Sequence, residues 1–191
     1  MSFFMQITLM HHGKPNLPPP AKLTAGMLQA WLQSYNTSGI CHQHRPPYET
    51  CHIASNSQVI VCSDLPRSLK SAAMLGLTDI HHIEPMFREL ALPHAHFPSP
   101  RLSINTWITF FRMLWFLGFS PNCESFREAK LRAQICAQKL KELAKQANSV
   151  LFIGHGALNR LIAKELLVSG WRGPRVPGKN YWEYGVYYLR A

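Results

Sequence analysis

The chain has 191 residues, of which 47% are hydrophobic and 16% charged, a composition typical of one folded domain with its own core. Its 20 lysines and arginines exceed its 10 aspartates and glutamates, and a net charge of +10 attracts phosphate esters and other anions. No apolar run approaches the roughly 18 residues of a membrane span, and no motif is typical of nucleic-acid binding. We therefore expect a single domain, residues 1–191, that binds a phosphorylated small molecule or another phosphomonoester rather than a nucleic acid or a membrane.

The N-terminus and the cysteines predict where the protein resides. The opening stretch "MSFFMQITLM" lacks the basic leader and the A-x-A-type cleavage site of a secreted protein. The five cysteines are an odd number without a short paired spacing, which is typical of reduced thiols. Both features predict a cytoplasmic protein.

Short apolar segments alternate with helical patterns along the chain. Strands are predicted, in chain order, at residues 5–10, 58–62, 149–154 and 185–189. Helices are predicted at residues 23–35, 67–75, 122–147 and 157–168, with Asn122 as the N-cap of the longest. This alternation predicts an α/β layered domain with a mostly parallel central sheet.

Residues 93–121 interrupt the alternation. The stretch "PHAHFPSP" predicts a loop, and "TWITFFRMLWFLGF" predicts an apolar helix that packs as a lid or a subunit contact. We expect its aromatic side chains to serve packing rather than substrate stacking: Trp107, Phe110, Phe111, Trp115 and Phe116. A homodimer formed through this insertion is an open alternative.

Polar side chains gather where the first three predicted strands end. They are His11, His12 and Gly13, then Ser63 and Asp64 with Arg67 one helical turn later, and finally His155 between two glycines. In open α/β sheets, ligands bind beyond the carboxyl ends of the strands. Three polar clusters at equivalent ends therefore predict one shared site.

These residue types suit phosphoryl transfer. A neutral imidazole such as His12 can attack phosphorus and carry the phosphoryl group. Cationic donors then stabilise the developing charge, which Arg67 and a protonated His155 would provide. An acid must protonate the leaving oxygen, and Glu89 in "FRELALP" is a candidate. The local pattern does not bring Glu89 to the strand ends, so its assignment rests on the family resemblance described below.

A competing pattern is the cluster "CHQHRPPYETCH". It holds five side chains that can bind zinc: Cys41, His42, His44, Cys51 and His52. Their spacing lacks both the C-x₂-C and the H-x₃-H pairs of a zinc finger. We therefore predict no metal and interpret the stretch as a loop between the first helix and the second strand.

Five short motifs occur in the order that is found in one known family. They are "LMHHGKP", "SDLPRSLKSA", "FRE" at residues 87–89, Glu124–Ser125 with Arg132 downstream, and "VLFIGHGALNRLI". Together they span residues 5 to about 165. In this order the sequence resembles the histidine phosphatase superfamily, also called phosphoglycerate-mutase-like, and within it the small phosphatases.

The resemblance implies a three-layer α/β/α sandwich that needs neither a metal nor an organic cofactor. It implies His12 as the nucleophile, Arg67 and His155 as groups that hold the phosphate, and Glu89 as the proton donor. The implied activity is that of an acid-type phosphomonoesterase working through a phosphohistidine on His12.

The sequence departs from the family where His11 replaces an arginine. An arginine would offer a permanent charge and two parallel donors, whereas histidine is cationic only in mild acid. We therefore predict that His11 binds phosphate in part, with impaired or acid-shifted activity. Two alternatives stay open: a pseudo-phosphatase that only binds phosphorylated ligands and, with less support, a phosphomutase.

Overall fold

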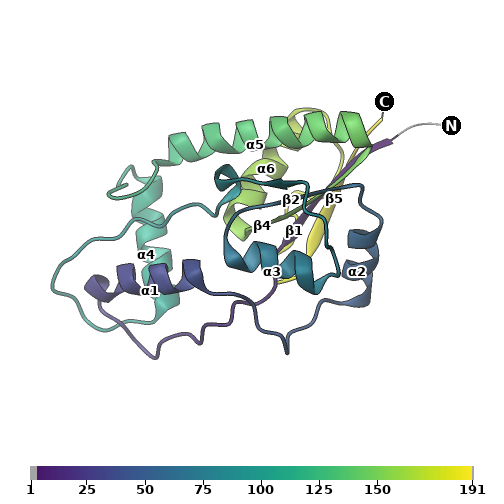
Figure 1. Cartoon of the computed structure of the whole chain (residues 1–191). Coiled ribbons are helices and arrows are strands. Elements are labelled where there is room, and N and C mark those ends of the chain that lie inside the picture. Colours follow the sequence, from purple (N-terminus) through teal and green to yellow (C-terminus); the bar gives the residue numbers. More distant parts are fainter. Residues whose placement is uncertain (1–3, 191) are drawn as a thin grey trace.

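The computed structural model describes residues 4–190, and its centre is a five-stranded sheet in the order β3-β2-β4-β1-β5 (Figure 1). The strands are β1 (Phe4–His11), β2 (Val59–Cys62), β3 (His82–Ile83), β4 (Ser149–Gly154) and β5 (Tyr184–Arg190). Only β5 pairs antiparallel, with β1, while the other described pairs are parallel. The mostly parallel sheet and all four predicted strands are confirmed.

Helices cover both faces of this sheet. They are α1 (Leu28–Thr37), α2 (Tyr48–Ser55), α3 (Pro66–Met74), α4 (Ile104–Phe116), α5 (Phe126–Ala147) and α6 (Gly156–Val168), with short 3-10 turns η1 (Ala25–Met27) and η2 (Pro85–Phe87). Alternate residues of β4 point to opposite sides: Phe152 packs with α5 and α6, and Ile153 packs with α2 and α3. The structure is therefore the expected three-layer α/β/α sandwich.

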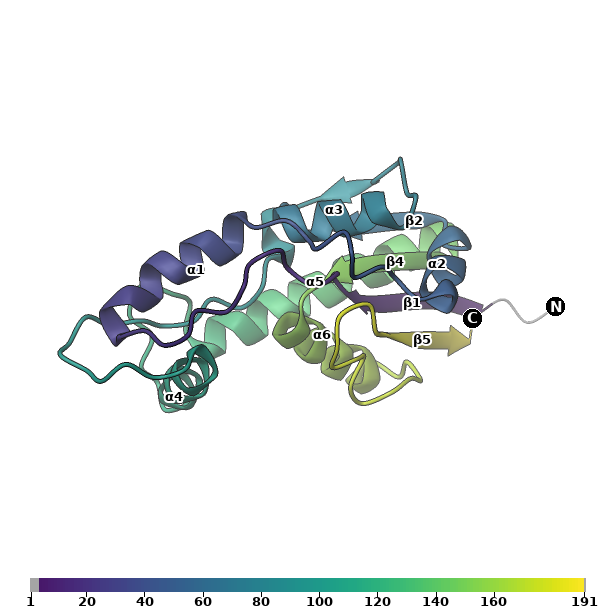
Figure 2. The same ribbon diagram turned by 90° about the horizontal axis from the view of Figure 1, so that it is seen from below.

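A third cluster of apolar side chains lies beyond the sheet, where α1 and α4 pack together (Figure 2). Its buried members include Leu28 of α1 and Trp107 and Phe111 of α4. The predicted packing of the insertion helix is thus correct for Trp107, Phe111 and Trp115, whereas Phe110 and Phe116 remain 43% and 54% exposed. This extension faces the carboxyl ends of β1, β2 and β4.

Two predicted helix starts are wrong. The long helix α5 begins after Ser125, because Ser125 and Glu128 form a reciprocal capping box, while Asn122 has a left-handed φ of 60°. The first helix begins at Leu28 rather than residue 23, since Leu23 forms an isolated β-bridge with Leu102. A side-chain cap in the first case, and a bridge to a distant segment in the second, outweighs the apolar periodicity.

Two elements were not predicted. Helix α2 occupies residues 48–55, where we expected a loop, and β3 is a two-residue edge strand. Both are too short to show a clear period.

Among residues 4–190, no three His, Cys, Asp or Glu side chains are placed to hold a metal ion. Within the same range no helix has the length and apolarity needed to cross a bilayer.

Candidate functional site

Three strand ends bring the predicted histidines and arginine into one cluster. The ring centroids of His12 and His11 are 4.7 Å apart, and those of His12 and His155 are 5.0 Å apart. Nε of Arg67 lies 3.2 Å from Nε2 of His12. Four of the five predicted site residues are therefore neighbours, as the carboxyl-end rule predicts.

His12 is held in one orientation. Its Nδ1 lies 2.8 Å from the Gly13 carbonyl oxygen, and a ring nitrogen that faces a carbonyl carries the hydrogen. The lone pair is then on Nε2, which accepts a hydrogen bond from Arg67. Burial, followed by the nearby His11 and Arg67, lowers the pKa of His12 well below 6.5. His12 is thus a neutral imidazole with its lone pair directed into the cluster.

Gly13 fixes the loop that presents His12. Its backbone amide donates to Ser71 Oγ at 2.8 Å, and Ser71 Oγ donates to the carbonyl of Arg67. A Cβ at position 13 would collide with the Trp182 ring. The glycine is therefore needed for close packing, and Ser71 links the loop directly to the helix that carries Arg67.

Arg67 is a buried cation, with 1% of its surface exposed. Its Nη1 donates to the Tyr35 carbonyl at 3.2 Å and to Asn36 Oδ1 at 3.4 Å, and its guanidinium lies over the Tyr35 ring at 4.6 Å. Between residues 4 and 190 no carboxylate lies within ion-pairing distance of it. Because a buried charge is costly without a counter-ion, this site favours an anion.

His155 faces Ser63, whose Oγ lies 2.7 Å from Nε2. Burial, followed by His12 and Arg67, lowers the pKa of His155 well below 6.5 in the free site. Its Nδ1 is buried without a partner in the described chain, as is Nδ1 of His11. Two nitrogens in one cluster therefore have unmet hydrogen-bonding capacity.

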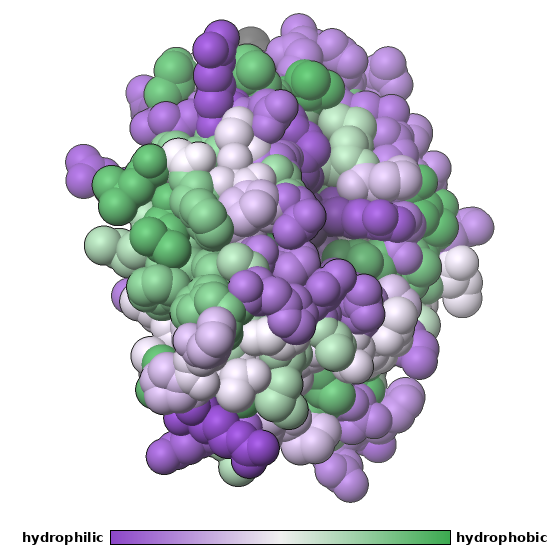
Figure 3. Space-filling view, turned by 90° about the vertical axis from the view of Figure 1, so that its left-hand side faces the viewer, coloured by the Kyte–Doolittle hydropathy of each residue, from purple (hydrophilic) through white to green (hydrophobic). Residues whose placement is uncertain are grey.

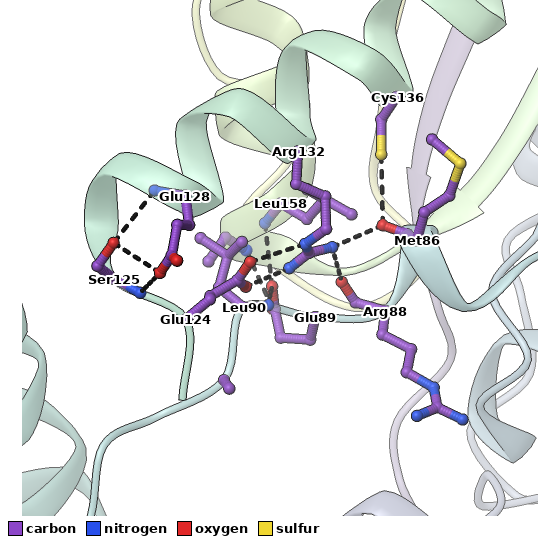
Figure 4. A network of polar contacts seen from close by, with 12 residues as sticks. Met86, Arg88, Glu89, Leu90, Glu124, Ser125, Glu128, Arg132, Cys136 and Leu158 are labelled. Atoms are coloured by element: carbon purple, nitrogen blue, oxygen red, sulfur yellow. Dashed lines mark hydrogen bonds and ion pairs between the residues drawn. The ribbon is translucent and has the colours of Figure 1, made fainter. Parts of the chain in front are cut away.

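Glu89 joins the site through helix α6, although its sequence neighbourhood did not predict this (Figure 4). Its Oε1 accepts from the amides of Leu90 and Leu158 at 2.9 and 3.0 Å, and Oε2 accepts from Ala157 at 3.1 Å. The carboxylate is therefore fixed at the start of the helix that follows His155. One lone-pair direction on Oε2 remains for a proton.

An ion pair supports the segment that carries Glu89. Arg132 of α5 binds both carboxylate oxygens of Glu124 and donates to the carbonyls of Met86 and Arg88 at 2.6 and 2.9 Å (Figure 4). The guanidinium thus ties residues 86–88 to α5. Asp64 takes no part in the site, because its carboxylate pairs with the side chain of Arg88.

Two tyrosines complete the cluster and were missed in the sequence. The Tyr181 ring centroid lies 5.2 Å from that of His11 and 5.8 Å from that of His12. Tyr35 lies under Arg67, and burial raises its pKa to about 12. The last strand pairs with β1, which places the residues just before β5 beside His11. The prediction of that strand could therefore have identified Tyr181 as a neighbour of the site.

A cavity of about 800 Å³ opens beside the cluster. Helix α1 and helix α4 form its walls, and Tyr35, Glu89 and Tyr181 line it next to the histidines. Figure 3 shows this end of the molecule, with a hollow between hydrophobic and hydrophilic surface. A molecule larger than phosphate therefore has space at the site.

Comparisons with known proteins agree with this fold. The model of the histidine phosphatase superfamily (branch 1) matches residues 52–180. A mycobacterial glucosyl-3-phosphoglycerate phosphatase, solved with VO3, superposes with a TM-score of 0.59 and 15% identity over 95% of this chain and 92% of that one. A Bacillus anthracis phosphoglycerate mutase has a TM-score of 0.58 and 15% identity, with 100% and 92% covered.

An alpha-ribazole phosphatase from Shigella flexneri has a TM-score of 0.53 and 17% identity over 85% of this chain and 79% of that one. No curated protein matches the sequence. At these identities the solved structures show a shared fold.

The family match begins at residue 52, after the His11–His12 pair, so it does not depend on the unusual first motif. The chain belongs to branch 1 of the histidine phosphatase superfamily, and this membership indicates phosphatase-type chemistry.

Proposed function

We propose that the protein is a phosphomonoesterase that forms a phosphohistidine on His12. The observation that carries the proposal is the fixed orientation of His12. Its Nδ1 is bound to the Gly13 carbonyl, and its Nε2 faces the buried cation of Arg67. A nucleophile that is neutral and already oriented loses little entropy when it attacks.

In the first step, the substrate's phosphoryl oxygens replace the contact between Arg67 and His12. The Nε2 lone pair attacks phosphorus, so that a nitrogen–phosphorus bond forms while the bond to the ester oxygen breaks. Glu89 acts as the general acid and gives a proton from Oε2 to the departing alkoxide. Arg67, His11 and His155 bind the oxygens on which negative charge develops.

In the second step, water attacks the phosphohistidine. The Glu89 carboxylate takes a proton from the water as its oxygen bonds to phosphorus. The nitrogen–phosphorus bond breaks, which returns neutral His12 and releases inorganic phosphate. Water is the only co-reactant, and Glu89 ends in its starting protonation state.

His11 sets the pH range of this activity. Burial is the main cause that lowers the pKa of His11 from 6.5, against the raising effect of Glu89 and the Asn180 backbone. The free protein therefore has a neutral His11 at pH 7. A bound phosphate dianion favours its protonated form, so we expect turnover to be faster in mild acid.

The same observation favours a second candidate, a protein that binds phosphate esters without hydrolysing them. A neutral His11 offers one weak donor where a charged fork would stabilise the transition state. The remaining groups would still bind an ester. Calorimetry with a phosphate ester separates the two functions, because the second requires binding without release of inorganic phosphate.

Rapid trapping tests the phosphomonoesterase directly. The protein is mixed with p-nitrophenyl phosphate carrying a radiolabelled phosphoryl group and quenched in base, where phosphohistidine survives, or in acid, where it is lost. We expect a base-stable label that His12→Asn abolishes, with kcat lower by on the order of 10⁴–10⁶. The control is His42→Asn, at an exposed histidine away from the site. Wild-type turnover by His12→Asn would exclude the proposal.

A further inference from the structure

The cavity beside the catalytic cluster is much larger than a phosphoryl group requires. Its volume of about 800 Å³ lies within the range of pockets that bind whole small molecules. Glu89 and Tyr181 line it, and Tyr181 contacts the rings of His11 and His12. A substrate with its phosphorus at His12 would therefore extend its alcohol part into this cavity.

One wall of the cavity is aromatic and begins at the phosphate-binding cation. The Arg67 guanidinium lies 4.6 Å from the centre of the Tyr35 ring. Tyr35 in turn stacks with Trp31 at 5.2 Å, with 22° between the ring planes. Tyr35 and Trp31 both line the cavity. Flat apolar surface thus continues outward from the position of the phosphoryl group.

The other walls mix aliphatic side chains with polar ones, among them Lys14, Arg88 and Arg112. Leu90 and Leu92 follow Glu89 in the chain, and Ile104 and Ile108 come from α4. Within the described chain, Glu89 is the sole carboxylate that lines the cavity. The hydroxyls of a substrate would find partners on the polar side chains, so the preference for a ring rests on the aromatic wall and the aliphatic side chains. An apolar group that packs against them gains from leaving water.

The aromatic wall carries an unsatisfied hydrogen-bond donor. Nε1 of Trp31 is buried and has no hydrogen-bond partner among residues 4–190. One acceptor atom on a ligand would satisfy it. The exposed amides of Gln29, Gln33 and Asn105 lie on the solvent side of the lining.

We propose that the substrate is the phosphomonoester of a large alcohol that carries an apolar ring. This rests on the proposed phosphomonoesterase activity and adds the chemical class of its substrate. The ring packs along Trp31 and Tyr35, the aliphatic side chains cover its other side, and the ester oxygen lies next to Glu89.

A pair of esters with equally poor leaving groups tests this assignment. Ethyl phosphate and 2-(1-naphthyl)ethyl phosphate both release a primary alkoxide, so they differ mainly in what enters the cavity. We expect kcat/KM to be about 10- to 100-fold higher for the naphthyl ester, the factor that burial of one aromatic group gives. Equal values, or a preference for ethyl phosphate, would overturn the proposal.

Variants on α4 connect the preference to the cavity. Ile108→Asn makes one aliphatic wall polar, and we expect the ratio of the two kcat/KM values to fall by about fivefold or more. The matched control is Met113→Asn on the same helix, where the side chain is 60% exposed and outside the cavity. Should Ile108→Asn not fold, Leu32→Asn makes the same test from α1. An unchanged ratio in a folded wall variant would also overturn the proposal.

The outcomes separate this proposal from the one on which it rests. If both esters are hydrolysed equally and His12→Asn abolishes the hydrolysis, the proposed substrate class is wrong and the proposed phosphomonoesterase activity stands. If the protein hydrolyses neither ester, the proposed phosphomonoesterase activity is wrong. In that case, calorimetric binding of the naphthyl ester that is tighter than that of ethyl phosphate would still support the cavity assignment, and equal binding would overturn it.

Discussion

Arg67 donates a hydrogen bond from Nε to Nε2 of His12, over 3.2 Å, and both side chains are almost completely buried. The bond occupies the lone pair that the proposed mechanism uses for attack. A phosphoryl group must therefore enter between the two side chains and take over the donor of Arg67. The free site holds its nucleophile in place with the same cation that later binds the substrate.

Substitution of Arg67 tests this dual role. Arg67→Lys keeps a positive charge but loses the planar donors that reach both His12 and the phosphoryl oxygens. We expect kcat/KM to fall by about 10²–10³, and Arg67→Ala to lose at least as much. Steady-state kinetics with p-nitrophenyl phosphate measures the loss. Arg127→Lys, at an exposed arginine of α5, should behave as wild type. Wild-type kcat/KM for Arg67→Lys would contradict the assignment.

The pH dependence should report the protonation of His11. Burial lowers its pKa from 6.5, so the free side chain loses its charge as the pH rises through a value below 6.5. A bound dianion shifts that loss to higher pH. We therefore expect kcat/KM, which reports the free protein, to fall as the pH rises through a value below 6.5, and kcat, which reports the complex, to fall at higher pH. His11→Arg should flatten both declines because arginine stays charged.

A neutral variant provides the control for that profile. His11→Gln keeps a donor that does not titrate, so its kcat/KM should be low and should lack the decline assigned to His11. If wild type and His11→Gln show the same pH profile, the titrating group is not His11. If the wild-type protein is inactive throughout and His11→Arg restores turnover, the binding protein is the better description.

Acid should destabilise the fold through the buried imidazoles of His12 and His155. The pKa values of His12 and His155 are well below 6.5 in the folded state, so the unfolded chain binds more protons once the pH falls below 6.5. The free energy of unfolding should then decrease by up to about 1.4 kcal/mol per pH unit for each group. Thermal unfolding between about pH 5 and pH 8 measures this slope.

Inorganic phosphate and a histidine variant check the origin of the slope. Phosphate pairs with the charged imidazoles, so it should raise Tm more at low pH than at neutral pH. His12→Asn should reduce the slope, whereas His42→Asn, at an exposed position, should keep it. An unchanged slope in His12→Asn would mean that other groups cause the acid sensitivity.

The predictable part of the site consists of residues that follow buried strands. Strand β4 lies where its apolar run predicts, at Ser149–Gly154, and His155 follows it directly. His12 and Arg67 follow β1 and β2 in the same way. Because parallel strands end at a common edge, short local patterns were sufficient to bring these three side chains together.

The position of Glu89 depends on distant parts of the chain. Its carboxylate binds amides 68 and 69 residues away, and Arg132 reaches back 46 residues to the carbonyl of Met86. No periodicity within "FRELALP" encodes such contacts. Tyr35 and the cavity were equally hidden, since they require α1 and α4 to pack together beyond the sheet. Only the family resemblance indicated Glu89.

Arg132 should act as a positioning residue for Glu89. Arg132→Gln removes the donors to Met86 and Arg88 and leaves Glu124 without its ion pair, at a cost of about 1–3 kcal/mol in the free energy of unfolding. Displacing the acid that protonates the leaving group can lower the rate by about 10². An alkoxide needs that proton, whereas p-nitrophenolate departs without it.

The two kinds of ester therefore reveal how Arg132 acts. We expect Arg132→Gln to lower kcat/KM strongly for ethyl phosphate and only slightly for p-nitrophenyl phosphate, with Glu89→Gln showing the same selective loss. Arg127→Gln, at an exposed arginine of the same helix, should affect neither ester. Assays run well below the Tm of each variant exclude unfolding as the cause. Equal losses for both esters in folded Arg132→Gln would mean that the ion pair supports the whole phosphate site rather than the placement of Glu89.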